Sequence, residues 1–171
     1  MLKTITQALL VGIFLSVSSG TMKACSCGAP GQILKLRLSQ GLVDPVYKDF
    51  ATNYQGAIFV GRVTERKKLK LRDLDWYEYR VTFEVERYWK GVENSKMVVF
   101  TGIGGGDCGI KFKKGENYIV FANFLNGRWQ TGICSLTMEG KFAPNVVKGL
   151  FLGEGEVPGP ISSEPKLKPD Y

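Results

Sequence analysis

The chain has 171 residues, a length that suits one domain with a buried core. Lysine and arginine together exceed aspartate and glutamate by seven, but the basic residues are spread along the sequence and predict no nucleic-acid binding. Histidine is absent, which excludes Ser/His/Asp and Cys/His nucleophilic sites, HExxH metalloprotease helices and zinc sites that need imidazole.

Residues 1–24 have the three-part pattern of a secretory signal peptide. Lys3 precedes an apolar run from Ala8 to Val17, and small residues follow at positions 18 to 20. The run has about ten residues, half of what a membrane-spanning helix needs, so we predict no transmembrane segment. We therefore expect an exported protein, either secreted or periplasmic.

The cleavage site of this signal peptide stays open between three positions. Small residues allow signal peptidase to cut after Ser19 or after Gly20, and Ala24 offers a later cut directly before Cys25. A small residue followed by cysteine also occurs at bacterial lipoprotein sites, so a lipid anchor at Cys25 is a further alternative. The cut decides which residue carries the free N-terminal amine.

The first element predicted after the signal peptide is a helix. Asp44 followed by Pro45 is typical of a helix start, and apolar residues then recur at helical spacing as far as Tyr54. The stretch from Gly31 to Val43, which precedes this helix, has no predicted element.

Five strands are predicted after this helix. The longest begins at Trp76 and alternates, with one face expected to be buried (Tyr77, Tyr79, Val81, Phe83, Val85) and the other solvated (Glu78, Arg80, Thr82, Glu84, Glu86). Four shorter strands are rich in β-branched and aromatic residues: Ala57–Thr64, Lys96–Thr101, Tyr118–Asn123 and Trp129–Cys134. Asn126-Gly127 predicts a hairpin between the last two. Five strands joined by turns predict a small closed barrel.

The chain after these strands is predicted to form one more helix and a tail. The helix is expected from Pro144 to Leu152, before Gly153. Residues 153–171 are rich in Pro, Gly, Ser, Glu and Lys, which predicts a disordered tail.

Paired carboxylates are the remaining candidates for acid and base catalysis. The acidic residues nearest one another in sequence alternate with basic ones, which favours a solvated face of balanced charge over an active site, so we predict that the chain is not an enzyme. The acidic residues concerned are Asp73, Asp75, Glu78, Glu84 and Glu86, and the basic ones are Lys70, Arg72, Arg80 and Arg87.

Four cysteines permit three disulfide pairings. Cys25 bonded to Cys27 would close a strained ring across one residue, so each is expected to pair with either Cys108 or Cys134, and both arrangements stay open. Four thiolates could instead bind zinc, but such sites usually use CxxC pairs in reducing compartments, and CxC in an exported chain favours disulfides. We expect no metal or cofactor of the protein's own.

Six motifs follow one another along the chain. They are Cys25-Ser26-Cys27, AIFVGRV at Ala57–Val63, Trp89-Lys90-Gly91, Asp107-Cys108-Gly109, YIVFA at Tyr118–Ala122 and Thr131-Gly132-Ile133-Cys134. In this order, and over most of the span from Cys25 to Leu152, the sequence resembles the tissue inhibitors of metalloproteinases, and most of all their single-domain bacterial relatives.

The resemblance implies a netrin-like domain over residues 25–152, built on a five-stranded OB-type closed barrel with two flanking helices. It implies the disulfides Cys25–Cys108 and Cys27–Cys134, which attach the N-terminal segment to the barrel. It also implies inhibition of zinc metalloendopeptidases, in which the free amine and the carbonyl of Cys25 chelate the target's catalytic zinc. Ser26 would face the specificity pocket and Cys27 would hold the segment rigid. We call residues Cys25 to Cys27 the inhibitory wedge.

The alternative is a non-inhibitory netrin-like module with a structural or interaction role at the cell surface or in the periplasm. In that case the CxC pair only anchors the N-terminus. Processing separates the two hypotheses, because the chelate exists only where Cys25 is the first residue. In the first hypothesis the partner is a zinc metalloprotease, and zinc enters only through that partner.

Overall fold

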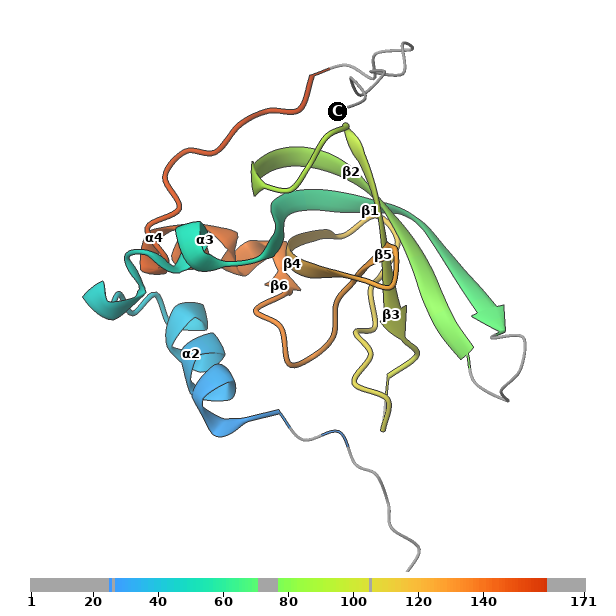
Figure 1. Ribbon diagram of the computed structural model, residues 1–171, viewed down its shortest axis with the longest axis horizontal. Coiled ribbons are helices and arrows are strands. Elements are labelled where there is room, and N and C mark those ends of the chain that lie inside the picture. The colour runs from blue at the N-terminus through green and yellow to red at the C-terminus, as the bar shows by residue number, and fades with distance from the viewer. Residues whose placement is uncertain (1–24, 26, 71–76, 105, 160–171) are drawn as a thin grey trace, which may run out of the picture.

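The computed structural model describes residues 25, 27–70, 77–104 and 106–159, which form a mainly β structure, as predicted (Figure 1). The described strands are β1 (Gly56–Lys70), β2 (Tyr77–Lys90), β3 (Lys96–Gly102), β4 (Asn117–Leu125), β5 (Arg128–Gln130) and β6 (Met138–Glu139). The helices are α2 (Ala29–Ser39), α3 (Phe50–Asn53) and α4 (Ala143–Gly149), with 3₁₀ turns η1 (Pro45–Tyr47) and η2 (Gly140–Phe142). None of these helices is long and apolar enough to cross a membrane. The predicted signal peptide lies outside the described residues.

The strands form one sheet in the order β1-β2-β3-β5-β4-β6, and an additional pairing of β1 with β4 closes five of them into a ring. These five correspond to the five predicted strands. Neighbours in the ring are antiparallel, apart from a parallel pairing of β3 with β5. The predicted hairpin joins β4 to β5, where Asn126 and Gly127 have positive φ angles of 52° and 75°.

The strand predicted at Trp129–Cys134 is shorter in the structure, because β5 ends at Gln130. The backbone then turns away from the sheet, and the Ile133 N–H donates a hydrogen bond to the carbonyl of Cys108 at 2.8 Å. The remainder of the predicted strand is therefore a loop that carries Cys134.

Residues 57–61 of β1 and 118–122 of β4 are shielded on both faces, which explains why these parts of the two strands are nearly continuous apolar runs. One face of each lines the inside of the ring, in a core shared with β2 and β3 (Ala57, Phe59, Val63, Val81, Phe83, Val85, Met97, Val99, Tyr118, Val120, Ala122). The other face packs against the helices, in a second core that includes Leu34, Leu38, Ile58, Ile119, Phe121, Val146 and Leu150. The helices accordingly lie together on one side of the ring in Figure 1.

The alternation predicted for β2 is confirmed in its central part, where Val81, Phe83 and Val85 are buried. The start of the strand differs from the prediction. Tyr77 is 38% exposed, whereas Glu78, which was expected on the solvated face, is only 9% exposed. Glu78 can be buried because it has a cationic partner from β5, described below.

The single helix predicted from Asp44 to Tyr54 is wrong. Asp44 does act as an N-cap, and its carboxylate accepts a hydrogen bond from the Val46 N–H at 3.1 Å, but the helical turn stops at Tyr47 and α3 starts only at Phe50. The side chain of Val46 is 74% exposed and is not packed in a core. The chain therefore lacks, at this position, the tertiary packing that stabilises most helices. The second predicted helix is present as α4 and ends at residue 149.

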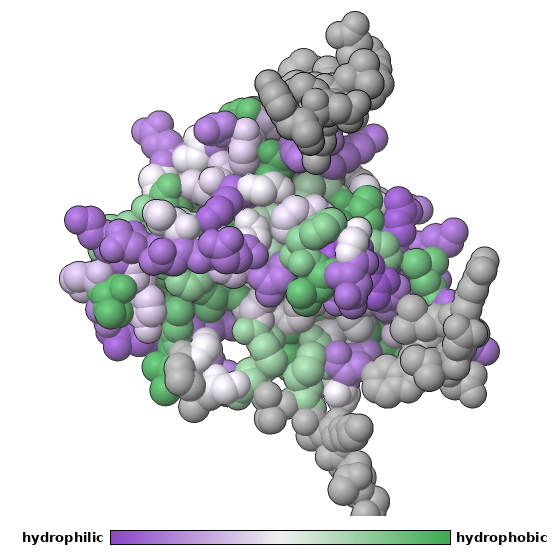
Figure 2. All heavy atoms as spheres, in the orientation of Figure 1, coloured by the Kyte–Doolittle hydropathy of each residue, from purple (hydrophilic) through white to green (hydrophobic). Residues whose placement is uncertain are grey.

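Helix α2 occupies most of the stretch for which no element was predicted. Leu34 and Leu38, one turn apart, are buried in the second core, while Ile33 and Leu36 are 57% and 59% exposed. Figure 2 shows apolar side chains interspersed among hydrophilic ones on this face, including the lower left of the view, where α2 lies. Apolar residues on both sides of α2 hide the helical period in its sequence.

The segment after α4 runs along β2. The backbones of Glu156 and Tyr88 exchange two hydrogen bonds, of 2.7 and 2.8 Å, and the Trp89 Nε1–H donates to the carbonyl of Gly153 at 3.1 Å. Through these hydrogen bonds the segment after α4 stays attached to β2 as far as Glu156. Residues 160–171, the rest of the predicted tail, lie outside the described part of the chain.

Candidate functional site

The two cysteines of the wedge, residues 25 to 27, are each bonded to a loop at the same end of the ring. Cys25 forms a disulfide with Cys108 and Cys27 forms one with Cys134, with Cα atoms 5.3 and 5.1 Å apart. These are the two pairs that the family resemblance implies. Ser26, between them, lies outside the described residues.

The Cys108 loop, which joins β3 to β4, is organised by the carboxylate of Asp107. Its oxygens accept hydrogen bonds from the backbone N–H groups of Ile103, Gly104 and Gly109, at 2.6, 2.9 and 3.0 Å. Cys108 itself has a φ of 60°, in the left-handed region that residues with side chains seldom adopt. The three bonds hold the backbone in the conformation that turns Cys108 toward Cys25.

The Cys134 loop, which joins β5 to β6, is held by a group of hydroxyls. The Oγ1 atom of Thr131 lies 2.9 Å from the Ser135 hydroxyl and 2.8 Å from that of Thr137. Thr137 in turn accepts a hydrogen bond from the Phe121 N–H of β4 at 2.9 Å. These hydroxyls are hydrogen-bonded to one another as well as to β4. The loop is therefore attached to the ring by hydrogen bonds between neutral groups.

The two loops also contact each other directly. Besides the hydrogen bond from Ile133 to Cys108, a Cβ atom at Gly132 would lie only 2.8 Å from the Cys108 carbonyl oxygen, so glycine permits this close approach. The two disulfides are neighbours, with the Sγ atoms of Cys25 and Cys134 4.0 Å apart. The wedge is therefore anchored at both ends to one continuous structure.

Helix α2 supports the same structure from the other side. The Gln32 amide donates to the carbonyl of Cys27 at 3.4 Å, and the Lys35 Nζ donates to the carbonyls of Ser135 and Ile133 at 3.2 and 3.4 Å. Burial of the Lys35 ammonium group lowers its pKa. Neither Gln32 nor Lys35 was among the site residues predicted from the sequence.

The sulfur atoms of Cys25, Cys108 and Cys134 lie within 4.8 Å of one another, a spacing that would suit a metal site if they were thiolates. In the described residues every cysteine is part of a disulfide. Metal ligation requires the deprotonated thiolate, so the oxidised group does not offer it. The structure thus contains the disulfide arrangement and not the four-thiolate alternative.

Three of the five carboxylates considered for catalysis, Glu78, Glu84 and Glu86, are dispersed along β2, and each has a partner of its own. Glu78 is the exception to the predicted solvated face: it is buried beside Arg128, with Oε1 and Nη1 2.6 Å apart. Asp73 and Asp75 lie outside the described residues. Glu84 and Glu86 make exposed contacts: Glu84 with Arg62 at 2.9 Å, and Glu86 with the Asn117 amide at 3.0 Å.

No family model matches this chain, and a search of the curated proteins finds no match to it.

Proposed function

We propose that this protein is an exported inhibitor of zinc metalloendopeptidases. The observation that carries the proposal is the double anchoring of the wedge: Cys25 and Cys27 are bonded to two loops that are hydrogen-bonded to each other. A segment held in its binding conformation loses little conformational entropy when it associates with a target. We propose further that the five-stranded ring is an OB-type barrel and that residues 25–152 form a netrin-like domain.

In the proposed mechanism the N-terminal amine and the carbonyl oxygen of Cys25 bind the catalytic zinc of the target. A catalytic zinc keeps one coordination position for water, so an N,O chelate that occupies this position blocks hydrolysis. Ser26 faces the specificity pocket of the target. The protein itself carries out no catalysis and needs no cofactor of its own.

Protonation of the amine competes with this chelate. An N-terminal amine has a reference pKa of about 8 and must lose its proton to bind a metal. Inhibition is therefore expected to weaken as the pH falls below neutrality.

The proposal depends on cleavage after Ala24. If residues remain ahead of Cys25, or if its amine carries a lipid, the chelate cannot form. The alternative function is then a non-inhibitory netrin-like module at the cell surface or in the periplasm. The contacts of Gln32 with Cys27 and of Lys35 with the Cys134 loop suit that role as well, because they support the anchored N-terminus whether or not its amine is free.

The first experiment is N-terminal sequencing and intact-mass measurement of the exported protein, with and without reduction. The expected result is a chain that begins at an unmodified Cys25 and gains the mass of four hydrogen atoms when its two disulfides are reduced. A start at Gly20 or Thr21, or a lipid mass on Cys25, would exclude the zinc-chelating mechanism.

The second experiment compares two proteins against a panel of secreted zinc endopeptidases. One begins at Cys25, and the matched control has one added alanine ahead of Cys25, which leaves both disulfides in place. Inhibition by the first protein alone supports the proposal. Equal inhibition by both proteins, or none by either across the panel, contradicts it.

A further inference from the structure

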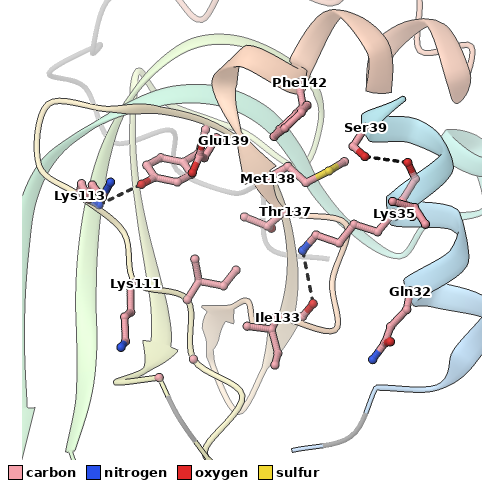
Figure 3. Close-up of a pocket in the computed structure, with 15 residues that line it drawn as sticks. Gln32, Lys35, Ser39, Lys111, Lys113, Ile133, Thr137, Met138, Glu139 and Phe142 are labelled. Atoms are coloured by element: carbon pink, nitrogen blue, oxygen red, sulfur yellow. Dashed lines mark hydrogen bonds between the residues drawn. The ribbon is translucent and has the colours of Figure 1, made fainter. Parts of the chain in front are cut away.

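A hollow lies between α2 and the ring, beside the Cys134 loop (Figure 3). Its volume is about 690 Å³, within the range of cavities that hold small molecules. One wall is formed by α2, and the other by the chain around β6 and the segment that follows the Cys108 loop. Apolar side chains make up much of the lining (Leu36, Ile110, Tyr118, Ile133, Met138, Phe142).

The charged groups of this cavity are mainly cations. Lys35, Lys111 and Lys113 line it, and Glu139 is the acidic residue among the lining side chains. Glu139 is already paired, because its Oε2 lies 2.6 Å from the Nζ of Lys141, and this bond lowers the pKa of Glu139. The lysines of the cavity thus keep an excess of positive charge over an apolar surface.

Lys35 is the most important of these cations, since its side chain crosses from α2 toward the opposite wall in Figure 3. Its Nζ donates to the carbonyls of Ile133 and Ser135, which are neutral acceptors. An ammonium group has three protons to donate, so one remains for a ligand. A partly buried cation whose described acceptors are neutral is well placed to attract an anion.

We propose that this cavity binds a small amphipathic anion, a free carboxylate with an apolar chain such as a medium-chain fatty acid. The carboxylate would accept a hydrogen bond from Lys35 and lie in the field of Lys111 and Lys113. The apolar chain would contact Leu36, Met138 and their neighbours. The burial that lowers the pKa of Lys35 agrees with this arrangement, because a carboxylate would replace the water that the ammonium group has lost.

The test is a titration of the exported protein with dodecanoate below its micelle concentration, followed by calorimetry. Dodecanol and dodecyltrimethylammonium serve as neutral and cationic probes with the same apolar chain. The expected result is binding of one dodecanoate per chain, at least tenfold more tightly than either probe. No binding of dodecanoate, or equal binding of dodecanol, would overturn the proposal.

Two pairs of variants locate the site. Leu36→Asp places a negative charge on the cavity wall and is expected to weaken dodecanoate binding at least tenfold. Ile33→Asp makes a similar change on the same helix, at a residue of equal exposure outside the lining, and is expected to leave binding within about twofold. Equal effects of the two aspartates would contradict the assignment.

The second pair tests the cation. Lys35→Met keeps an unbranched side chain of nearly the same length and removes its charge, and it is expected to remove the preference for dodecanoate over dodecanol. Lys148→Met, on the exposed face of α4, is the matched control and is expected to keep that preference. Retention of the preference in Lys35→Met would show that Lys35 does not bind the carboxylate. The proposal does not depend on the proposed inhibition, so a protein with alanine ahead of Cys25 should bind dodecanoate unchanged.

Discussion

Two ion pairs on the same strand show how strongly burial changes the role of a charge. Glu78 and Glu84 both lie on β2 and both pair with arginine, at 2.6 and 2.9 Å. The side chain of Glu78 is 12% exposed, whereas that of Glu84 is 51% exposed. Removing one partner of a buried pair leaves an uncompensated charge, while an exposed pair contributes little.

We therefore expect Glu78→Gln to lower the free energy of unfolding by about 1 to 3 kcal/mol, a range discounted for the partial exposure of Arg128. Glu84→Gln, the matched change on the same strand, is expected to cost about 1 kcal/mol or less. Urea denaturation of both variants measures the difference. Equal losses would mean that Glu78 is as well solvated as Glu84.

Unlike Glu78, which is buried with a partner, the hydroxyl of Tyr54 is a buried polar group with no hydrogen-bond partner among the described residues. Burial raises the pKa of Tyr54 to about 12, because the ionised form loses its hydration. The unfolded chain, with the ordinary pKa near 10, ionises first, so stability is unaffected below pH 10 and falls between pH 10 and about 12.

Tyr54→Phe is expected to be neutral or to raise stability by up to about 1 kcal/mol at pH 7, since no bond is lost. At pH 11 its advantage should increase by about 1 kcal/mol, because phenylalanine cannot ionise. Denaturation at both pH values, with Tyr47→Phe from the same core as the control, provides the measurement. A destabilised Tyr54→Phe at pH 7 would indicate that the hydroxyl has a partner.

At the scale of elements, the ring strands could be predicted from sequence and the N-terminal helices could not. Strand β2 alternates clearly because one face is buried, and the turn at Asn126-Gly127 has its own local signal. Helix α2 has apolar residues on both sides, since Leu34 and Leu38 face a core while Ile33 and Leu36 are exposed. Pro30 in its first turn is the one local signal that could have located it.

The candidate site also has parts that could be predicted from the sequence and parts that could not. The cysteines are evident in the sequence, and excluding the Cys25–Cys27 ring left two pairings open. The contacts of Lys35 could not be predicted, because its partners are backbone carbonyls 98 and 100 residues away, and a carbonyl acceptor leaves no mark in a sequence. The burial of Glu78 depends likewise on Arg128, which is 50 residues away.

The packing of α2 against α4 gives a test at this scale. A Cβ atom at Gly149 of α4 would overlap the buried side chain of Leu38. Gly149→Ala is expected to cost about 1 to 2 kcal/mol by overpacking, and Leu38→Ala about 2 to 4 kcal/mol by leaving a cavity. The double variant should lose less than the sum, because truncating Leu38 makes room for the new methyl group.

Denaturation of the two single variants and the double variant measures this coupling. Gly149→Ala combined with Val99→Ala, in the core inside the ring, is the control and should be additive. Additive losses for Gly149 and Leu38 would mean that the two helices do not pack as described.

For the molecule as a whole, β1 and β4 connect two cores, one inside the ring and one under the helices. The disulfides attach the chain just ahead of α2 to the end of the ring, across 83 and 107 residues of sequence. Taken singly, loops of this length stabilise the folded state by about 4 to 5 kcal/mol in the chain-entropy model. The two bonds share most of their loops, however, so they are not independent.

When one disulfide is present, the other closes a much shorter path, of about 28 residues: the two from 25 to 27 and the 26 from 108 to 134. The path is the same whichever bond is formed first. Removing either pair alone by serine substitution should therefore cost about the same, roughly 3.6 kcal/mol, and removing both about 8 kcal/mol. A domain with a typical stability of about 5 to 15 kcal/mol would tolerate the first loss and come close to unfolding with the second. Urea denaturation of the three variants distinguishes this from independent cross-links, for which each single loss would be about 4.6 to 4.8 kcal/mol and the loss of both about 9 kcal/mol.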